Sequence, residues 1–178
     1  MINVELKGNI VKEYEAGTTA ADIAKSLGMG LYKSACAAKI DGKVVDLRTT
    51  INNDCSLEIL TFDDEQGKKA YWHTTSHIMA QAVTRLFPNV GLAIGPSIDN
   101  GFYYDFDLDT PLTPSDLEKI EAEMKKIIKE NLPLERFELS TDEAIKLMEE
   151  KNQKYKVELI YGNKGQKKYI SYFTIDKT

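Results

Sequence analysis

The chain has 178 residues, 42% hydrophobic and 29% charged, proportions typical of a globular protein with one sizeable domain or two small ones. Its net charge of −5 argues against a protein that coats nucleic acid through an overall basic surface. No apolar run approaches the roughly 18 residues that span a bilayer, and the N-terminus lacks a signal-peptide pattern. We therefore expect a cytoplasmic protein with no membrane partner, in which Cys36 and Cys55 are reduced core residues.

Residues 1–62 predict a small domain in which two hairpins flank a short helix. Turn residues at 7–9 and at Asp41-Gly42 separate strand-like runs, because glycine supplies the positive φ that a tight hairpin needs. Between them, Thr18 or Thr19 can cap a helix that Gly28 ends. We expect a thin core between sheet and helix, formed by Val4, Leu6, Ile10, Val44, Leu57, Ile59 and Leu60 on the sheet and by Ile23, Ala24 and Leu27 on the helix.

The next segment contains the only two histidines of the chain. The polar residues 63–69 are typical of a hinge, and apolar residues at helical spacing then predict a helix that ends at Pro88. This helix carries His73 and His77, and positions four residues apart lie on the same helical face. Both imidazoles therefore point into one small volume, where they could move protons near neutral pH. The structural alternative is two half-buried histidines that bind backbone carbonyls.

Residues 63–178 as a whole predict an α+β domain. Two apolar runs flank Asp99-Asn100-Gly101 and predict a β-hairpin, with Gly95-Pro96 bending its first strand. A capping box at Thr113 and Asp116 starts a helix over 114–131, and a second one at Ser140 and Glu143 starts another. The remaining predicted strands are 132–140, 155–162 and 168–175.

Several chemistries find no support in the sequence. Neither nucleotide-binding fingerprint occurs, since there is no Gly-rich loop ending in Gly-Lys-Ser/Thr and no GxGxxG after a strand. A zinc-protease helix needs Glu after its first histidine, but position 74 is Thr, and the cysteines lie in the other domain. We therefore expect no metal site and no cofactor in this chain. Ser76 is conceivable as a nucleophile beside a histidine, although it lies on a helix body rather than on an exposed elbow.

Lysines are concentrated near the C-terminal end, where they could contact a phosphate backbone or form a solvated face. They are Lys146, Lys151, Lys154, Lys156, Lys164, Lys167 and Lys168, against three glutamates.

Four features in order closely resemble bacterial threonyl-tRNA synthetase: HTTSHIMAQAV (73–83), IGPSIDNGFYYDFD (94–107), the capped helix and YKVELI (155–160). The resemblance implies that residues 1–62 are a TGS domain, a ubiquitin-like β-grasp. It implies that residues 63–178 are most of the second domain, which hydrolyses mischarged seryl-tRNA. The implied partners are the acceptor end of tRNA(Thr) and the rest of the synthetase.

The resemblance also implies roles for individual residues. His73 and His77 would handle the attacking water, Lys156 would complete the catalytic set, and Tyr104 would bind substrate near the terminal adenosine. Residue type alone would favour a surface lysine at 156 and a core aromatic at 104.

In the family, a Cys-x-x-x-His motif follows the strand predicted at 168–175, but no cysteine or histidine follows His77 here. Zinc, ATP and magnesium are expected only in a catalytic domain that this sequence lacks. We therefore expect an N-terminal fragment that cannot aminoacylate alone and deacylates weakly or not at all. The alternatives are a stand-alone tRNA-binding or regulatory module, and the front end of a TGS-containing nucleoside kinase.

Overall fold

The computed structural model describes residues 1–132, 135–162 and 169–174. They divide into two compact units, Met1–Thr74 and Thr75–Thr178. The division falls inside one helix, α3 (Glu65–Leu86), between the two histidines. None of the helices in these described ranges is long and apolar enough to cross a membrane.

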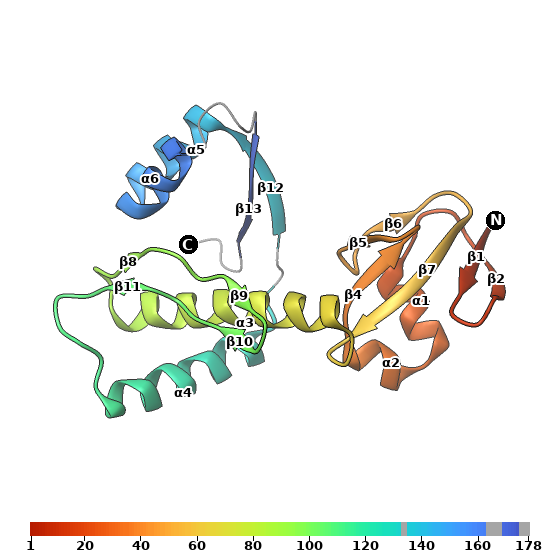
Figure 1. Ribbon diagram of the computed structural model, residues 1–178, viewed down its shortest axis with the longest axis horizontal. Coiled ribbons are helices and arrows are strands. Elements are labelled where there is room, and N and C mark those ends of the chain that lie inside the picture. Colours follow the sequence, from red (N-terminus) through yellow and green to blue (C-terminus); the bar gives the residue numbers. More distant parts are fainter. Residues whose placement is uncertain (133–134, 163–168, 175–178) are drawn as a thin grey trace. The chain divides into compact units, whose positions relative to one another are not determined.

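The first unit is a mixed five-stranded sheet with two helices (Figure 1). The strand order is β2-β1-β7-β4-β5, in which β1 pairs with β7 in parallel and every other pair is antiparallel. The elements are β1 (Ile2–Leu6), β2 (Ile10–Tyr14), β3 (Thr18–Thr19), α1 (Ala20–Leu27), α2 (Met29–Ser34), β4 (Ala35–Ile40), β5 (Lys43–Val45), β6 (Thr50–Ile51) and β7 (Cys55–Thr61). This is the β-grasp arrangement expected for residues 1–62.

Local residues account for the two hairpin turns and the start of α1 in this unit. The hairpin β1–β2 turns through Gly8 and Asn9, and β4–β5 turns through Asp41 and Gly42, all with positive φ. Thr19 caps α1 in a reciprocal hydrogen-bonded box with the residue at N3, and α1 ends before Gly28. Both predicted hairpins and the predicted cap are therefore confirmed.

The core of this unit lies where α1 covers the central strands β4 and β7. Val4 and Leu57 are buried there as expected, and Leu60 is buried outside this cluster. Ile10 and Val44, however, are 54% and 39% exposed, so their assignment to the core was wrong. They belong to β2 and β5, the two edge strands, in which no residue is fully buried. The structure adds buried residues that the pattern did not single out: Ile2, Ala20, Ala38 and Ile51.

The predicted hinge over 63–69 is also wrong, because α3 begins at Glu65. The turn before it is closed by Asp64, whose carboxylate accepts hydrogen bonds from the Thr61 N–H (2.7 Å) and hydroxyl (3.2 Å). Gly67 is buried against this turn, where a Cβ atom would lie 2.0 Å from the carbonyl oxygen of Thr61. Residues that suggested a linker by composition therefore form a tight strand-to-helix junction.

In the second unit, a long β-ribbon lies beside two helices. α3 packs against α4 (Pro114–Glu130) through a shared apolar core that includes Val83 and Ile120. The ribbon pairs β8 (Gly91–Leu92) with β11 (Phe106–Asp107), and β9 (Ser97–Ile98) with β10 (Gly101–Phe102). The predicted hairpin at 99–101 is therefore confirmed.

Capping also fixes the helix starts in this unit. Thr113 and Asp116 form the predicted box, and hydrogen bonds from Thr113 lower the pKa of Asp116 to about 2. Ser140 and Glu143 form the second box, at the start of α5 (Thr141–Glu150).

The C-terminal part pairs β12 (Glu135–Ser140) with β13 (Tyr169–Thr174), in agreement with two of the three predicted strands. The third, 155–162, is instead helical, as part of α6 (Lys154–Gly162). Its alternating run also satisfies helical spacing, since Val157 and Ile160 lie one turn apart and pack on the buried residues of α5. Lys164, Lys167 and Lys168 lie outside the described residues.

Candidate functional site

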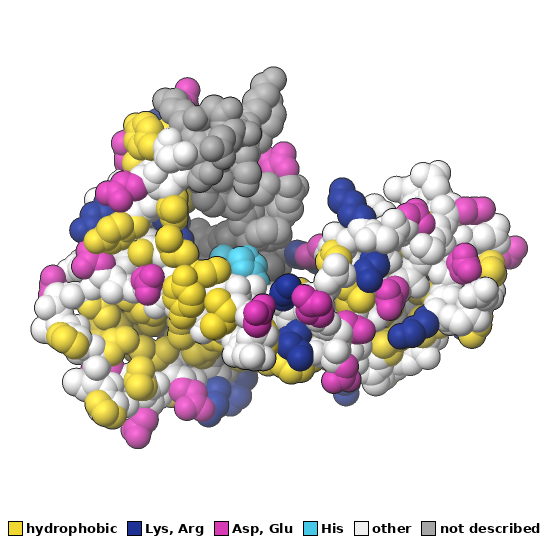
Figure 2. Space-filling model, viewed as in Figure 1, with side chains coloured by type: hydrophobic (Ala, Val, Ile, Leu, Met, Phe, Trp, Pro, Cys, Tyr) yellow, Lys and Arg dark blue, Asp and Glu magenta, His cyan; other side chains and the backbone are white. Residues whose placement is uncertain are grey.

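The histidine-bearing face of α3 is anchored by a serine between the two histidines. Ser76 is fully buried, and its hydroxyl donates a hydrogen bond to the carbonyl oxygen of Gly95 at 3.2 Å. A buried hydroxyl in this role holds α3 to the ribbon and is not placed to attack a substrate. Imidazole surface is visible on this face (cyan in Figure 2). Although His73 is exposed as a residue, partial burial of its ring lowers its pKa, and His77 is half-buried.

Gly95 lets an aromatic ring lie directly against the ribbon backbone. A Cβ atom at Gly95 would lie 2.0 Å from Cδ2 of Tyr104. The Tyr104 ring stacks on Phe106, with centroids 4.9 Å apart and planes inclined by 10°. Burial raises the pKa of Tyr104, so its phenol is neutral near pH 7.

Lys156 turns inward from α6 and meets this tyrosine. Its Nζ donates to the carbonyl oxygen of Ala93 at 2.8 Å, and it lies 3.3 Å from Oη of Tyr104. The ammonium also lies 5.5 Å from the centroid of the Tyr104 ring. Burial lowers the pKa of Lys156, which is half-buried. The structure therefore brings together Tyr104 and Lys156, two of the predicted site residues, and removes Lys156 from the solvated lysine cluster.

The first turn of α6 is held on the ribbon by contacts that the sequence did not indicate. The side-chain oxygen of Gln153 accepts a hydrogen bond from the Leu92 N–H at 3.0 Å. Tyr155 donates its hydroxyl hydrogen bond to Asp107 at 2.9 Å, and Lys154 forms an ion pair with the same carboxylate. The strand predicted over 155–162 could not include these contacts, because they depend on helical spacing between residues 153 and 156.

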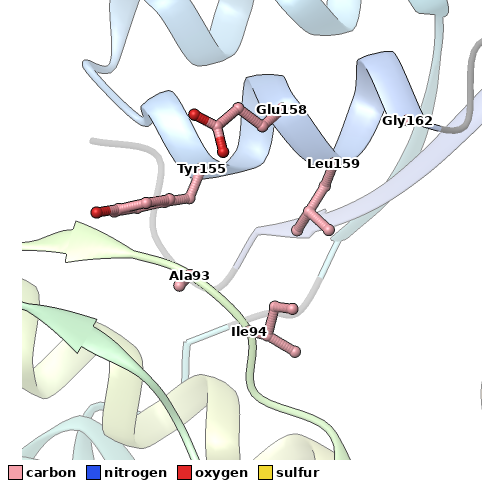
Figure 3. A pocket seen from close by; sticks show the side chains of 6 residues that line it. All are labelled: Ala93, Ile94, Tyr155, Glu158, Leu159 and Gly162. Carbon is pink, nitrogen blue, oxygen red and sulfur yellow. The ribbon is translucent and has the colours of Figure 1, made fainter.

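A cavity of about 390 Å³ lies beside the Lys156 contact (Figure 3). One wall is the face of α6 that carries residues 155, 158, 159 and 162, and the other is the ribbon at Ala93 and Ile94. Glu158 is the one carboxylate in its lining. The cavity thus has largely apolar walls, and it shares Ala93 with the Lys156 contact.

Within the described ranges, no three histidine, cysteine or acidic side chains gather closely enough to hold a metal ion.

Comparison with known proteins bears on both units. Residues 2–61 match the TGS domain family. The first unit contains a TGS domain. The chain is 63% identical over 160 residues to threonine–tRNA ligase from Clostridium botulinum strain Hall, and 58% identical over 160 residues to that of Acetivibrio thermocellus. These matches cover 90% of this chain, so the resemblance to the N-terminal region of threonine–tRNA ligases is confirmed. The chain spans about a quarter of the length of these curated relatives.

Proposed function

We propose that this chain acts as the N-terminal region of a threonine–tRNA ligase, and that residues 63–178 belong to the domain that hydrolyses seryl-tRNA(Thr). The observation that carries the proposal is the inward Lys156 ammonium, 3.3 Å from the Tyr104 hydroxyl. Ser76 supports it by joining the helix of His73 and His77 to the same ribbon. The high identity to threonine–tRNA ligases favours this function over a nucleoside kinase.

Ester hydrolysis needs a water molecule near the carbonyl carbon, a base for its proton and a donor for the developing oxyanion. A lowered pKa keeps the imidazole of His73 neutral at pH 7, as a general base requires. His77, on the same helical face, would help to hold the water. Lys156 supplies an ammonium donor for the oxyanion or the leaving ribose oxygen, and Tyr104 offers a ring and a neutral hydroxyl to the terminal adenosine.

A second site that hydrolyses the wrong ester is useful because threonine and serine differ by one methyl group, which is worth only ~1–3 kcal/mol in a binding pocket. A synthetic site that grips the shared hydroxyl cannot reject serine strongly. We propose the acceptor end of tRNA(Thr) and the rest of a synthetase as partners in the cytoplasm. We expect no aminoacylation by the chain alone, since no nucleotide-binding fingerprint occurs in it.

Single-turnover deacylation tests the proposal. The substrates are seryl- and threonyl-tRNA(Thr), and the enzyme is a chain that continues through the family's Cys-x-x-x-His segment. We expect hydrolysis of the seryl ester only, and loss of this activity in Lys156→Ala. The matched control is Lys146→Ala, which removes an exposed lysine of α5. If the extended chain leaves seryl-tRNA intact, or if both lysine variants behave alike, the proposal fails.

A further inference from the structure

Gln153 connects three elements at the start of α6. Its N–H donates to the carbonyl of Met148 in α5 at 2.8 Å. Its own carbonyl accepts from the N–H groups of Lys156 (3.0 Å) and Val157 (3.2 Å) in the first turn of α6. Its side-chain oxygen accepts from the Leu92 N–H in β8. The residue therefore fixes where α6 begins relative to the ribbon.

Lys156 lies one helical turn further on and binds the next residue of the ribbon. Gln153 holds the N–H of Leu92, and Lys156 Nζ holds the carbonyl of Ala93. Two side chains, one just before α6 and one in its first turn, therefore bind adjacent residues of the ribbon. A shift of α6 along the ribbon would withdraw Nζ from both Ala93 and Tyr104.

We propose that Gln153 is a positioning residue that sets the location of the Lys156 ammonium. The consequence for hydrolysis rests on the proposed function, whereas the positioning itself does not. The second tie between α6 and the ribbon, through Asp107, is solvent-exposed and shared with Lys154. Exposed ion pairs contribute little, so the half-buried Gln153 contact has the larger effect on position.

The test compares Gln153→Met, which keeps the side-chain length but removes the acceptor, with Gln153→Glu, which retains an acceptor oxygen. Gln66→Met, at an exposed position of α3, is the matched control. The first readout is hydrogen exchange at the Leu92 amide. We expect it to be about fivefold faster in Gln153→Met, as for loss of one hydrogen bond, and unchanged in Gln153→Glu and in the control.

The second readout is the pH midpoint of Lys156 acetylation by acetic anhydride, followed by mass spectrometry. Burial lowers the pKa of Lys156, so release of its ammonium into water should move the midpoint to higher pH in Gln153→Met. The groups that face Nζ are the Ala93 carbonyl and Tyr104, whose phenol stays neutral below its raised pKa. A midpoint that matches the control would overturn the proposal.

Two further outcomes are decisive. Circular dichroism shows whether Gln153→Met still folds. If it does not, the Gln153→Glu variant tests the proposal, because it keeps an acceptor oxygen. Loss of Leu92 amide protection in Gln153→Glu would then contradict a role for that oxygen. Seryl-tRNA hydrolysis is measured separately, with a decrease of up to about 100-fold expected for a misplaced group. A shifted midpoint with unchanged hydrolysis would leave the positioning role intact and contradict the catalytic role of Lys156.

Discussion

Both units use surface carboxylates to bind backbone N–H groups, but the second unit also holds a half-buried ammonium. In the first unit, carboxylates at the surface tie loops to backbone: Asp54 accepts from the Asn3 N–H at 2.7 Å, and Asp41 from the Ser56 N–H at 2.8 Å. In the second unit, Lys156 extends its polar group into a half-buried setting. Removing a charged group from water is costly unless it has partners, and it changes the group's pKa. The first pattern stabilises a framework, whereas the second shifts the pKa of the ammonium that we propose for hydrolysis.

The largest expected effect is on seryl-tRNA hydrolysis, the activity that we propose. In a chain that includes the Cys-x-x-x-His segment, His73→Ala should reduce seryl-tRNA deacylation by about 10²–10⁴-fold, the usual contribution of a general base. Wild-type activity should persist to a pH below the ordinary imidazole value of 6.5 and fall at lower pH, because burial lowers the pKa of His73 and only the neutral ring accepts a proton. The pH–rate profile measures both.

The 178-residue chain itself should be nearly inactive in the same assay, because the family's second motif is absent from it and water and leaving group are then poorly held. Rapid deacylation by this chain, sensitive to His73→Ala, would show that the two histidines suffice.

The next largest effect separates core from edge in the TGS domain. Leu60→Ala should lower the free energy of unfolding by about 2–5 kcal/mol, because Leu60 is 2% exposed in a small core. Ile10→Ala, on the edge strand, should change it by less than about 0.5 kcal/mol. Urea denaturation of both variants provides the measurement. Equal losses would mean that the edge strand is buried in solution.

The same contrast explains what the sequence could predict. The hairpins at Gly8 and Asp41-Gly42 and the caps at Thr113 and Ser140 depend on residues within one turn, and all were correctly predicted. The first cap was narrowed to Thr18 or Thr19, and the structure has it at Thr19. The exposure of Ile10 depends on which strand lies at the sheet edge, which no local pattern encodes.

The candidate site shows the same limit. The resemblance identified Lys156 and Tyr104, and the structure brings them together. The contacts of Gln153 and Asp107 were not predicted, because their partners lie 61 and 48 residues away in the sequence. Gly95 was predicted only to bend its strand, and its packing against Tyr104 depends on how the ribbon folds. The polar stretch around Gly67 was misread because its packing against Thr61 depends on a turn, not on composition.

Gly95→Ala tests whether the second unit depends on close packing at its site. The added methyl would overlap the stacked ring of Tyr104, so we expect a loss of about 1–3 kcal/mol in stability. Hydrolysis should fall as well, because the ring must leave Lys156. Gly30→Ala, in α2, meets no atom within 4 Å and should be neutral or slightly stabilising. A Gly95→Ala variant as stable and active as wild type would show that Tyr104 is not part of the site.

The smallest effect concerns RNA contact by the exposed lysines. Lys156 is excluded from this group because its ammonium points inward, which leaves Lys146, Lys151 and Lys154 as the described members of the cluster. If they meet phosphates, Lys151→Gln and Lys154→Gln should each weaken tRNA binding modestly and reduce the salt dependence by about 0.7–0.9 per lost contact. Lys43→Gln, at an exposed position of the TGS domain, is the control. The measurement is filter binding of tRNA over a range of salt concentrations. An equal loss of tRNA affinity in Lys43→Gln would assign RNA contact to both units. An unchanged dependence of affinity on salt would mean that these lysines are solvated surface.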